Sequence, residues 1–255
     1  MFPLTSNPQL LHAVLEALAI SLGTLYYRIG LRRKSGGIPA SFMSNNRFLV
    51  LIGCLFGAAL GNKIVFWLEM PHLFPLYWNK PEVWFAGQSV VGGLLGGLIG
   101  VEIAKRGARI RQSTGDAFVF PVLLGLIIGR VGCFAAGLAD GTYGVPTGLP
   151  WGVDFGDGVP RHPTQLYEII FAAVMWVVLA RQRVVWSSQP GLLFKVMLWS
   201  YLLWRFMVDG IKPNPFDYGL GLSGIQVVCA VALVVYAPLC FSQWRRLKVC
   251  GESQE

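Results

Sequence analysis

The sequence predicts an all-α integral membrane protein of one domain, residues 1–255, with about seven transmembrane helices. Hydrophobic residues make up 54% of the chain, and the mean hydropathy is +0.55. Charged residues make up 13%, against roughly 25% in a soluble domain. Seven apolar stretches each approach the roughly 20 residues that a helix needs to cross a bilayer. They lie near residues 10–29, 47–68, 87–104, 115–137, 163–181, 190–209 and 222–243.

Basic residues predict the orientation of these helices, because cytoplasmic loops of membrane proteins are enriched in Lys and Arg. Most of the 21 basic residues lie in the loops after the first, third and fifth stretches and in the C-terminal tail. The opposite loops contain only Lys80, Arg161 and Lys212. We therefore expect an outer N-terminus and a cytoplasmic C-terminus. The net charge of +8 comes from these loops, so no nucleic-acid partner is expected.

The first stretch, 10–29, is expected to stay in the mature protein. It is not preceded by Lys or Arg, and no small-residue cleavage site follows it, unlike a signal peptide. The second and third stretches contain glycines four residues apart, which lets two helix backbones approach closely. These are Gly53, Gly57 and Gly61 in one, and Gly92, Gly96 and Gly100 in the other. We expect both helices to pack in the interior of the bundle.

Two outer loops have distinct compositions. Residues 70–85 are rich in aromatic residues and proline, which is typical of a segment at the depth of the lipid headgroups. Residues 138–162 are rich in Gly, Pro and Asp, which predicts turns and a short hairpin. Loops of this length are often functional.

Polar residues gather toward the outer ends of the apolar stretches. Lys63, Arg130 and Arg205 lie inside them, where a charge costs a few kcal/mol unless it has a partner or a ligand. Further polar residues are expected at the same level: His12, Glu16, Gln88, His162, Gln165, Tyr167, Glu168, Asp209 and Gln226. This one-sided distribution favours a site for an anionic lipid of the outer leaflet over a transport path. The alternative is structural ion pairs, such as Arg205 with Asp209 and His12 with Glu16.

The cysteines predict neither a disulfide nor a metal site. Cys54, Cys133, Cys229 and Cys240 lie in apolar stretches, and Cys250 lies in the tail. No two of them have the spacing of a zinc motif. We expect no metal and no cofactor.

Two motifs resemble the prolipoprotein diacylglyceryl transferase family. They are Gly129-Arg130-Val131-Gly132-Cys133-Phe134 and Arg161-His162-Pro163-Thr164-Gln165-Leu166-Tyr167-Glu168. Two shorter segments agree with it, Trp204-Arg205 with Asp209 and Ser223-Gly224-Ile225-Gln226. The resemblance implies a multi-pass enzyme of the bacterial inner membrane. Such an enzyme moves a diacylglyceryl group from phosphatidylglycerol to a cysteine thiol of a secreted precursor, and glycerol phosphate leaves.

The resemblance also implies roles for residues. Arg130 and Arg205 match the family's essential arginines and are expected to hold the phosphate. The family's catalytic histidine is replaced by Val91, so the base is expected to be His12, oriented by Glu16, or His162. Tyr143-Gly144 is expected to match a Trp-Gly pair. The residues expected to bind substrate are Lys63, Gln88, Asp140, Tyr143, Gly144, Gln165, Tyr167, Glu168, Asp209 and Gln226. The rival hypothesis is an accessory protein that binds anionic lipid without catalysis.

Overall fold

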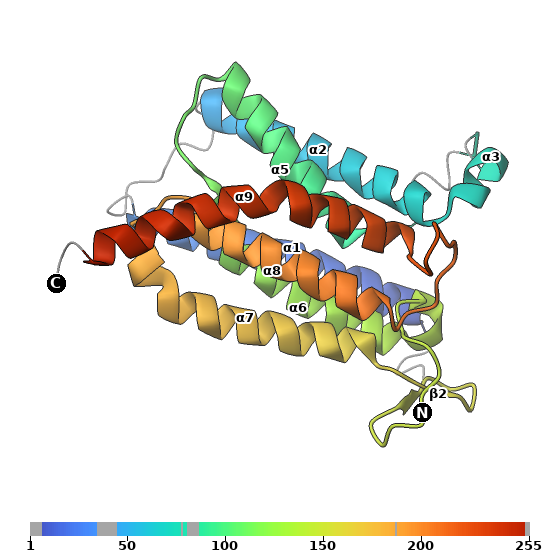
Figure 1. Ribbon diagram of the computed structural model, residues 1–255. Coiled ribbons are helices and arrows are strands. Elements are labelled where there is room, and N and C mark those ends of the chain that lie inside the picture. The colour runs from blue at the N-terminus through green and yellow to red at the C-terminus, as the bar shows by residue number, and fades with distance from the viewer. Residues whose placement is uncertain (1–6, 35–44, 78, 81–86, 187, 253–255) are drawn as a thin grey trace.

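The computed structural model of the chain describes residues 7–34, 45–77, 79–80, 87–186 and 188–252, and most of them are helical (Figure 1). Seven helices of 18 residues or more occur within these ranges, and each overlaps one predicted apolar stretch. They are α1 (Pro8–Lys34), α2 (Asn45–Glu69), α5 (Val90–Gly107), α6 (Val119–Ala136), α7 (Thr164–Trp186), α8 (Leu192–Asp209) and α9 (Gly224–Glu252). The helical fold class is therefore confirmed.

Four helical segments are long and apolar enough to cross a membrane, judged over the described part of the chain. They are Leu10–Gly30, Phe48–Glu69, Gly115–Asp140 and Thr164–Trp186. A shorter apolar helical segment spans Gly224–Cys240. The start of α1 and the end of α9 lie at opposite ends of the bundle (Figure 1).

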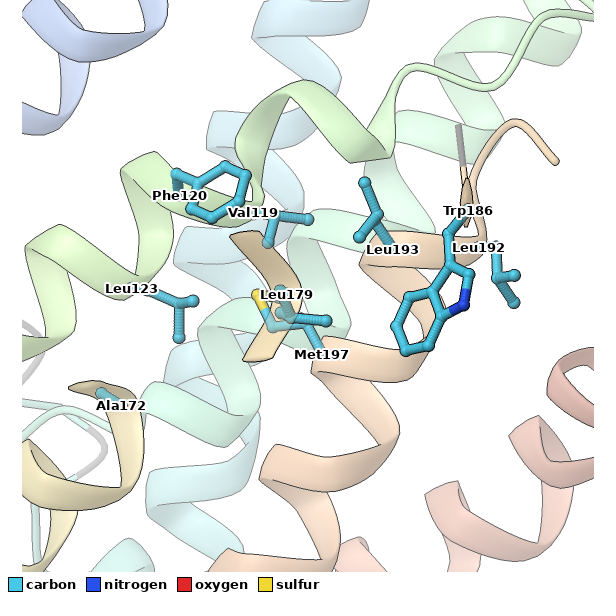
Figure 2. Packing of buried hydrophobic residues seen from close by; sticks show 9 residues of the cluster. All are labelled: Val119, Phe120, Leu123, Ala172, Leu179, Trp186, Leu192, Leu193 and Met197. Atoms are coloured by element: carbon cyan, nitrogen blue, oxygen red, sulfur yellow. The ribbon is translucent and has the colours of Figure 1, made fainter. Parts of the chain in front are cut away.

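Helices α6, α7 and α8 share one buried hydrophobic core. Buried apolar side chains from these helices pack together in one cluster (Figure 2). They are Val119, Phe120, Leu123, Ala172, Leu179, Trp186, Leu192, Leu193 and Met197. A second cluster joins α8 to α9 and α5, and it includes Leu202, Cys229 and Val91. These two clusters hold the polar ends of α6, α7 and α8 in a fixed arrangement.

Helices α2 and α5 pack through their glycines, as predicted. A Cβ atom on Gly57 would lie 2.3 Å from the carbonyl oxygen of Gly96, and one on Gly100 would lie 2.0 Å from that of Gly53. The expectation that α2 lies in the bundle interior is wrong, because Phe56 on its other face is 71% exposed. The two helices pack against each other through the glycines, and the outer face of α2 stays exposed. Figure 1 shows α2 and α5 at one side of the bundle.

The predicted hairpin is present in the loop between α6 and α7. Strand β1 (Val153–Asp154) pairs antiparallel with β2 (Pro160–Arg161). The Asp154 carboxylate accepts backbone N–H bonds from the turn, and Arg161 forms two bonds of 2.7 Å with Asp157. We call this side of the molecule the hairpin end. The short elements are η1 (Pro71–Leu73), α3 (Phe74–Tyr77), η2 (Gly115–Phe118) and η3 (Gly137–Asp140).

The aromatic segment 70–85 is described only in part, since residues 78 and 81–86 fall outside the described ranges. In α3, Phe74 and Leu76 are exposed. Large apolar side chains on the surface suit a segment at a membrane interface.

Candidate functional site

Two buried arginines from different helices share one carboxylate. Arg130 Nε on α6 lies 2.8 Å from Glu168 Oε2 on α7, and Arg205 Nη1 on α8 lies 3.6 Å from the same oxygen. Tyr201 on α8 donates its hydroxyl to the other oxygen of Glu168 at 2.8 Å. Glu168 is only 1% exposed. We call Arg130, Glu168, Tyr201 and Arg205, together with Asp209, the arginine cluster.

Asp209 supplies the second negative charge of this cluster. Its Oδ1 lies 3.0 Å from Arg205 Nη2, one helical turn away, as the structural-pair alternative predicted. The Ser223 hydroxyl donates to the other oxygen of Asp209. Among the described residues, Nε and Nη1 of Arg205 have no hydrogen-bond partner. The cluster therefore neutralises both arginines and still leaves donors for a further anion.

A cavity of about 2070 Å³ runs beside the arginine cluster, with both arginines in its wall. It extends from His12 at the hairpin end to Arg183 near the other end of the bundle. Pockets for small molecules usually measure about 300–1,000 Å³. This cavity is larger, and apolar side chains such as Leu123 and Met197 form much of the rest of its wall. A site with a cationic end and a long apolar wall suits an anionic lipid.

At the hairpin end, His12, Cys133 and Asp140 meet in the cavity wall. His12 Nε2 lies 3.8 Å from Asp140 Oδ1 and 3.7 Å from Cys133 Sγ. Asp140 also accepts a hydrogen bond from the Thr142 hydroxyl. Arg130 Nη1 lies 3.8 Å from the same sulfur, so this group adjoins the arginine cluster.

Lys212 adds a titratable cation to this end of the cavity. It follows α8, lines the cavity and is partly buried. Burial, with the neighbouring guanidinium groups of Arg205 and Arg130, lowers the pKa of Lys212 to about 7. Its charge therefore changes near neutral pH.

Seven of the residues expected from the sequence line the cavity: His12, Glu16, Gln88, Arg130, Asp140, Tyr143 and Arg205. The expected partnership of His12 with Glu16 is replaced by a contact of 3.8 Å between His12 Nε2 and Asp140 Oδ1. The loop after α6 brings Asp140 back over the start of α1, whereas Glu16 lies one turn further along that helix.

Lys63 does not join the two arginines. Its Nζ donates to the backbone carbonyl of Gly87 at 2.8 Å and lies 5.6 Å from the centre of the Phe66 ring. It is not among the residues that line the cavity. The three cations thus do not converge, because the end of α2 packs on the segment before α5 and α2 stands at the edge of the bundle.

His162 and Gly144 in the hairpin loop, and Tyr167 in the first turn of α7, are not among the residues that line the cavity. His162 Nδ1 is 3.1 Å from the Tyr167 hydroxyl, which also accepts a bond of 2.9 Å from Trp151. A Cβ atom on Gly144 would lie 2.7 Å from the Cβ atom of His162. These residues hold the loop against the start of α7. The roles expected for them at the site stay predictions.

Gln226 and Gln165 also lie outside the cavity wall. Ser223 and Gln226 form a reciprocal capping box at the start of α9, with bonds of 3.0 and 3.1 Å. Gln226 thus caps α9, which the pattern Ser-x-x-Gln could have revealed, and its substrate-binding role stays a prediction. Gln165 is 1% exposed, and neither its side-chain nitrogen nor its oxygen has a hydrogen-bond partner among the described residues. Glu168 and Asp209 do not line the cavity themselves, but each contacts an arginine that does.

Sequence reasoning missed three residues of this region. Tyr201 lies one turn before Arg205 on α8, a spacing that would have placed both on one face. Lys212 was counted only among the basic residues of the outer loops. Cys133 was taken for a core residue, and no local spacing links it to His12, 121 positions away.

The fold and the site define a helical membrane protein with a large cavity that has two buried arginines in its wall. The sequence profile of prolipoprotein diacylglyceryl transferase matches residues 7–241, so the chain belongs to that family. A relative from Nitratidesulfovibrio vulgaris is 34% identical, over 79% of this chain and 82% of its own. Relatives from Bordetella parapertussis and Nitrosospira multiformis are both 30% identical, over 80% and 89% of this chain and 79% and 88% of theirs. All three are phosphatidylglycerol–prolipoprotein diacylglyceryl transferases.

Proposed function

We propose that the protein transfers a diacylglyceryl group from phosphatidylglycerol to the cysteine thiol of a lipoprotein precursor. The observation that carries this proposal is the pair of arginines, Arg130 and Arg205, at the polar end of the large cavity. Membership of the transferase family supports it. The acyl chains lie along the apolar wall, and the phosphate lies at the arginines.

The arginine cluster binds the donor phosphate. A guanidinium group presents paired N–H donors that match two phosphate oxygens. Glu168 holds Arg130 and Arg205 at fixed positions from a third helix, so little reorganisation is needed when charge develops. Lys212, when protonated, adds a third positive charge. The same groups stabilise the phosphate as it departs.

The transfer forms one carbon–sulfur bond and breaks one carbon–oxygen bond. The acceptor thiol loses its proton, and its sulfur attacks the terminal glyceryl carbon of the diacylglyceryl group. The electron pair of the broken bond stays on the phosphate oxygen, and the phosphate takes up one proton as glycerol phosphate leaves. We place the deprotonation at the hairpin end of the cavity, where His12 and Asp140 lie in the wall. His162 is assigned instead to positioning the hairpin loop.

The transmembrane topology belongs to the same proposal. All seven long helices cross the bacterial inner membrane, with the hairpin end outside and the C-terminus in the cytoplasm. Single cysteines at Ser113 and Gly148, in a variant without the native cysteines, test this with a membrane-impermeant thiol reagent. We expect labelling at position 148 in intact spheroplasts and at position 113 only after lysis. Labelling of both positions from one side contradicts the topology.

The activity is tested with purified protein, radiolabelled phosphatidylglycerol and a peptide that carries a lipobox cysteine. We expect labelled peptide and an equal amount of glycerol phosphate. The matched control is the same peptide with serine in place of the cysteine, which should remain unlabelled. Hydrolysis of the lipid without peptide labelling contradicts the transferase proposal.

One observation favours the second candidate, a lipid-binding protein without catalysis. Val91, at the position of the family's histidine, is 1% exposed and lines the cavity, so it offers no base there. Under this alternative, phosphatidylglycerol copurifies with the protein but neither peptide labelling nor glycerol phosphate appears.

A further inference from the structure

Three side chains with metal-binding atoms converge at the hairpin end of the cavity. Within the part of the chain that the structure describes, His12, Cys133 and Asp140 form the one such group, and their ligand atoms lie within 4.8 Å of one another. They come from α1, α6 and η3. Atoms bound to one tetrahedral zinc ion lie roughly 3.3–3.6 Å apart. The distances of 3.7 and 3.8 Å from His12 Nε2 are close to this spacing.

The geometry differs from that of a catalytic triad. In a triad, one ring nitrogen of the histidine faces the nucleophile and the other faces the carboxylate. Here the same atom, His12 Nε2, faces both Cys133 Sγ and Asp140 Oδ1. A nitrogen, a sulfur and an oxygen thus point toward one shared space. Such an arrangement suits a cation between them better than a proton relay through the ring.

We propose that His12, Cys133 and Asp140 bind one Zn²⁺ ion, with a fourth coordination position open to the cavity. Nitrogen, thiolate and carboxylate are all zinc ligands, and three protein ligands with an open position are typical of catalytic zinc. One thiolate and one carboxylate balance the charge of the ion. The His12 side chain is 36% exposed, which leaves a path for the ion to enter.

This inference rests on the proposed transferase function and deepens it, because it names how the acceptor thiol is activated. The thiol takes the open position and displaces a water molecule. Its proton passes to solvent, since a thiol that coordinates a metal ion is deprotonated. The bound sulfur keeps its electron pair for attack on the donor carbon. His12 is then a ligand of the ion, and no separate histidine is needed where Val91 stands.

The position of the site fits this step. Arg130 precedes Cys133 by three residues on α6, and its Nη1 lies 3.8 Å from the sulfur. The phosphate at the arginine cluster and the thiol at the zinc ion would therefore be held by adjacent turns of one helix. Holding two reactants at such close range lowers the entropic cost of their reaction.

The binding experiment uses detergent-purified full-length protein and ZnCl₂. After dialysis we expect about one zinc ion per chain by elemental analysis, and at least tenfold weaker binding for Cys133→Ser and for His12→Gln. Cobalt substitution should give a thiolate charge-transfer band that Cys133→Ser lacks. The matched control is Cys54→Ser, another cysteine of the cavity wall, which should bind like the original chain. Unfolding temperatures confirm that each variant is folded.

Absence of stoichiometric zinc, or equal binding by Cys133→Ser, overturns the site. The activity experiment is separate: chelation should abolish peptide labelling, and zinc should restore it. Full labelling by the metal-free protein overturns the role in thiol activation and leaves the transferase function intact. If no form of the protein labels the peptide, the transferase proposal fails, and the zinc measurement still decides whether the site exists.

Discussion

Arg161 on the hairpin and Arg130 in the bundle each contact a carboxylate at short range, but in different surroundings. Arg161 forms two bonds of 2.7 Å with Asp157, whose side chain is 35% exposed. Arg130 lies 2.8 Å from Glu168, whose side chain is 1% exposed. The exposed pair has the better geometry, since it is bidentate. The buried pair shares its carboxylate with a second arginine.

The comparison indicates that burial, and not the geometry of the contact, determines how much stability is lost when one partner of an ion pair is removed. Water replaces a lost partner on the hairpin, so an exposed pair contributes little. Inside the bundle, a charge without its partner has no such replacement. The hydrogen bonds from Arg161 do lower the pKa of Asp157, but that carboxylate remains in solvent.

The largest effect is expected from Glu168→Gln, which keeps the size of the side chain and removes its charge. Arg130 and Arg205 then face each other without their shared anion. We expect the free energy of unfolding to fall by about 3–5 kcal/mol. Unfolding of the purified protein in detergent, followed by circular dichroism, measures it. A loss below about 1 kcal/mol would mean that the cluster behaves like an exposed pair.

Arg130→Lys and Arg205→Lys keep the charge and remove the planar fork. We expect each to lower kcat/KM for phosphatidylglycerol at least tenfold, which corresponds to about 1.4 kcal/mol. Arg161→Lys is the matched control, because that arginine lies outside the cavity wall and should tolerate the change. Normal turnover with lysine at both cavity positions would reduce their role to that of a general positive charge.

Lys212 is expected to make the affinity of the cavity for an anionic lipid depend on pH. Because its pKa is lowered to about 7, the side chain is protonated below that pH and neutral above it. Affinity for the anionic donor should therefore fall as the pH rises through 7, by about threefold to tenfold. Titration with phosphatidylglycerol in mixed micelles measures this change.

Two variants test the assignment to Lys212. Lys212→Arg stays charged and should keep the high affinity at alkaline pH, whereas Lys212→Met should bind weakly at every pH. An unchanged pH profile in Lys212→Met would assign the titration to another group.

The smallest effect is expected from Asp157→Asn on the hairpin. The Asp154 carboxylate still accepts the backbone N–H groups of the turn, and solvent still reaches Arg161. The unfolding temperature and the rate of peptide labelling should equal those of the original chain. A loss as large as that of Glu168→Gln would contradict the distinction between the two pairs.

Much of the fold could be predicted from local patterns in the sequence. The positions of the long helices follow from apolar stretches, because each stretch must bury its backbone hydrogen bonds within itself. The contact between α2 and α5 follows from glycines four residues apart, and the hairpin follows from turn residues. The pair of Arg205 with Asp209 was predictable as well, because residues four apart on a helix share a face.

The sequence by itself thus determined where the helices lie, which cations need partners and which contacts form within one helical turn. Only the tertiary structure decided that Glu168 joins Arg130 to Arg205, that His12 meets Cys133 and Asp140, and that His162 lies outside the cavity wall. The physical reason is that helix rotation and tilt come from packing between helices, as at the cluster of α6, α7 and α8. Periodicity predicts on which face of a helix a residue lies, whereas packing between helices determines which neighbouring helix that face contacts.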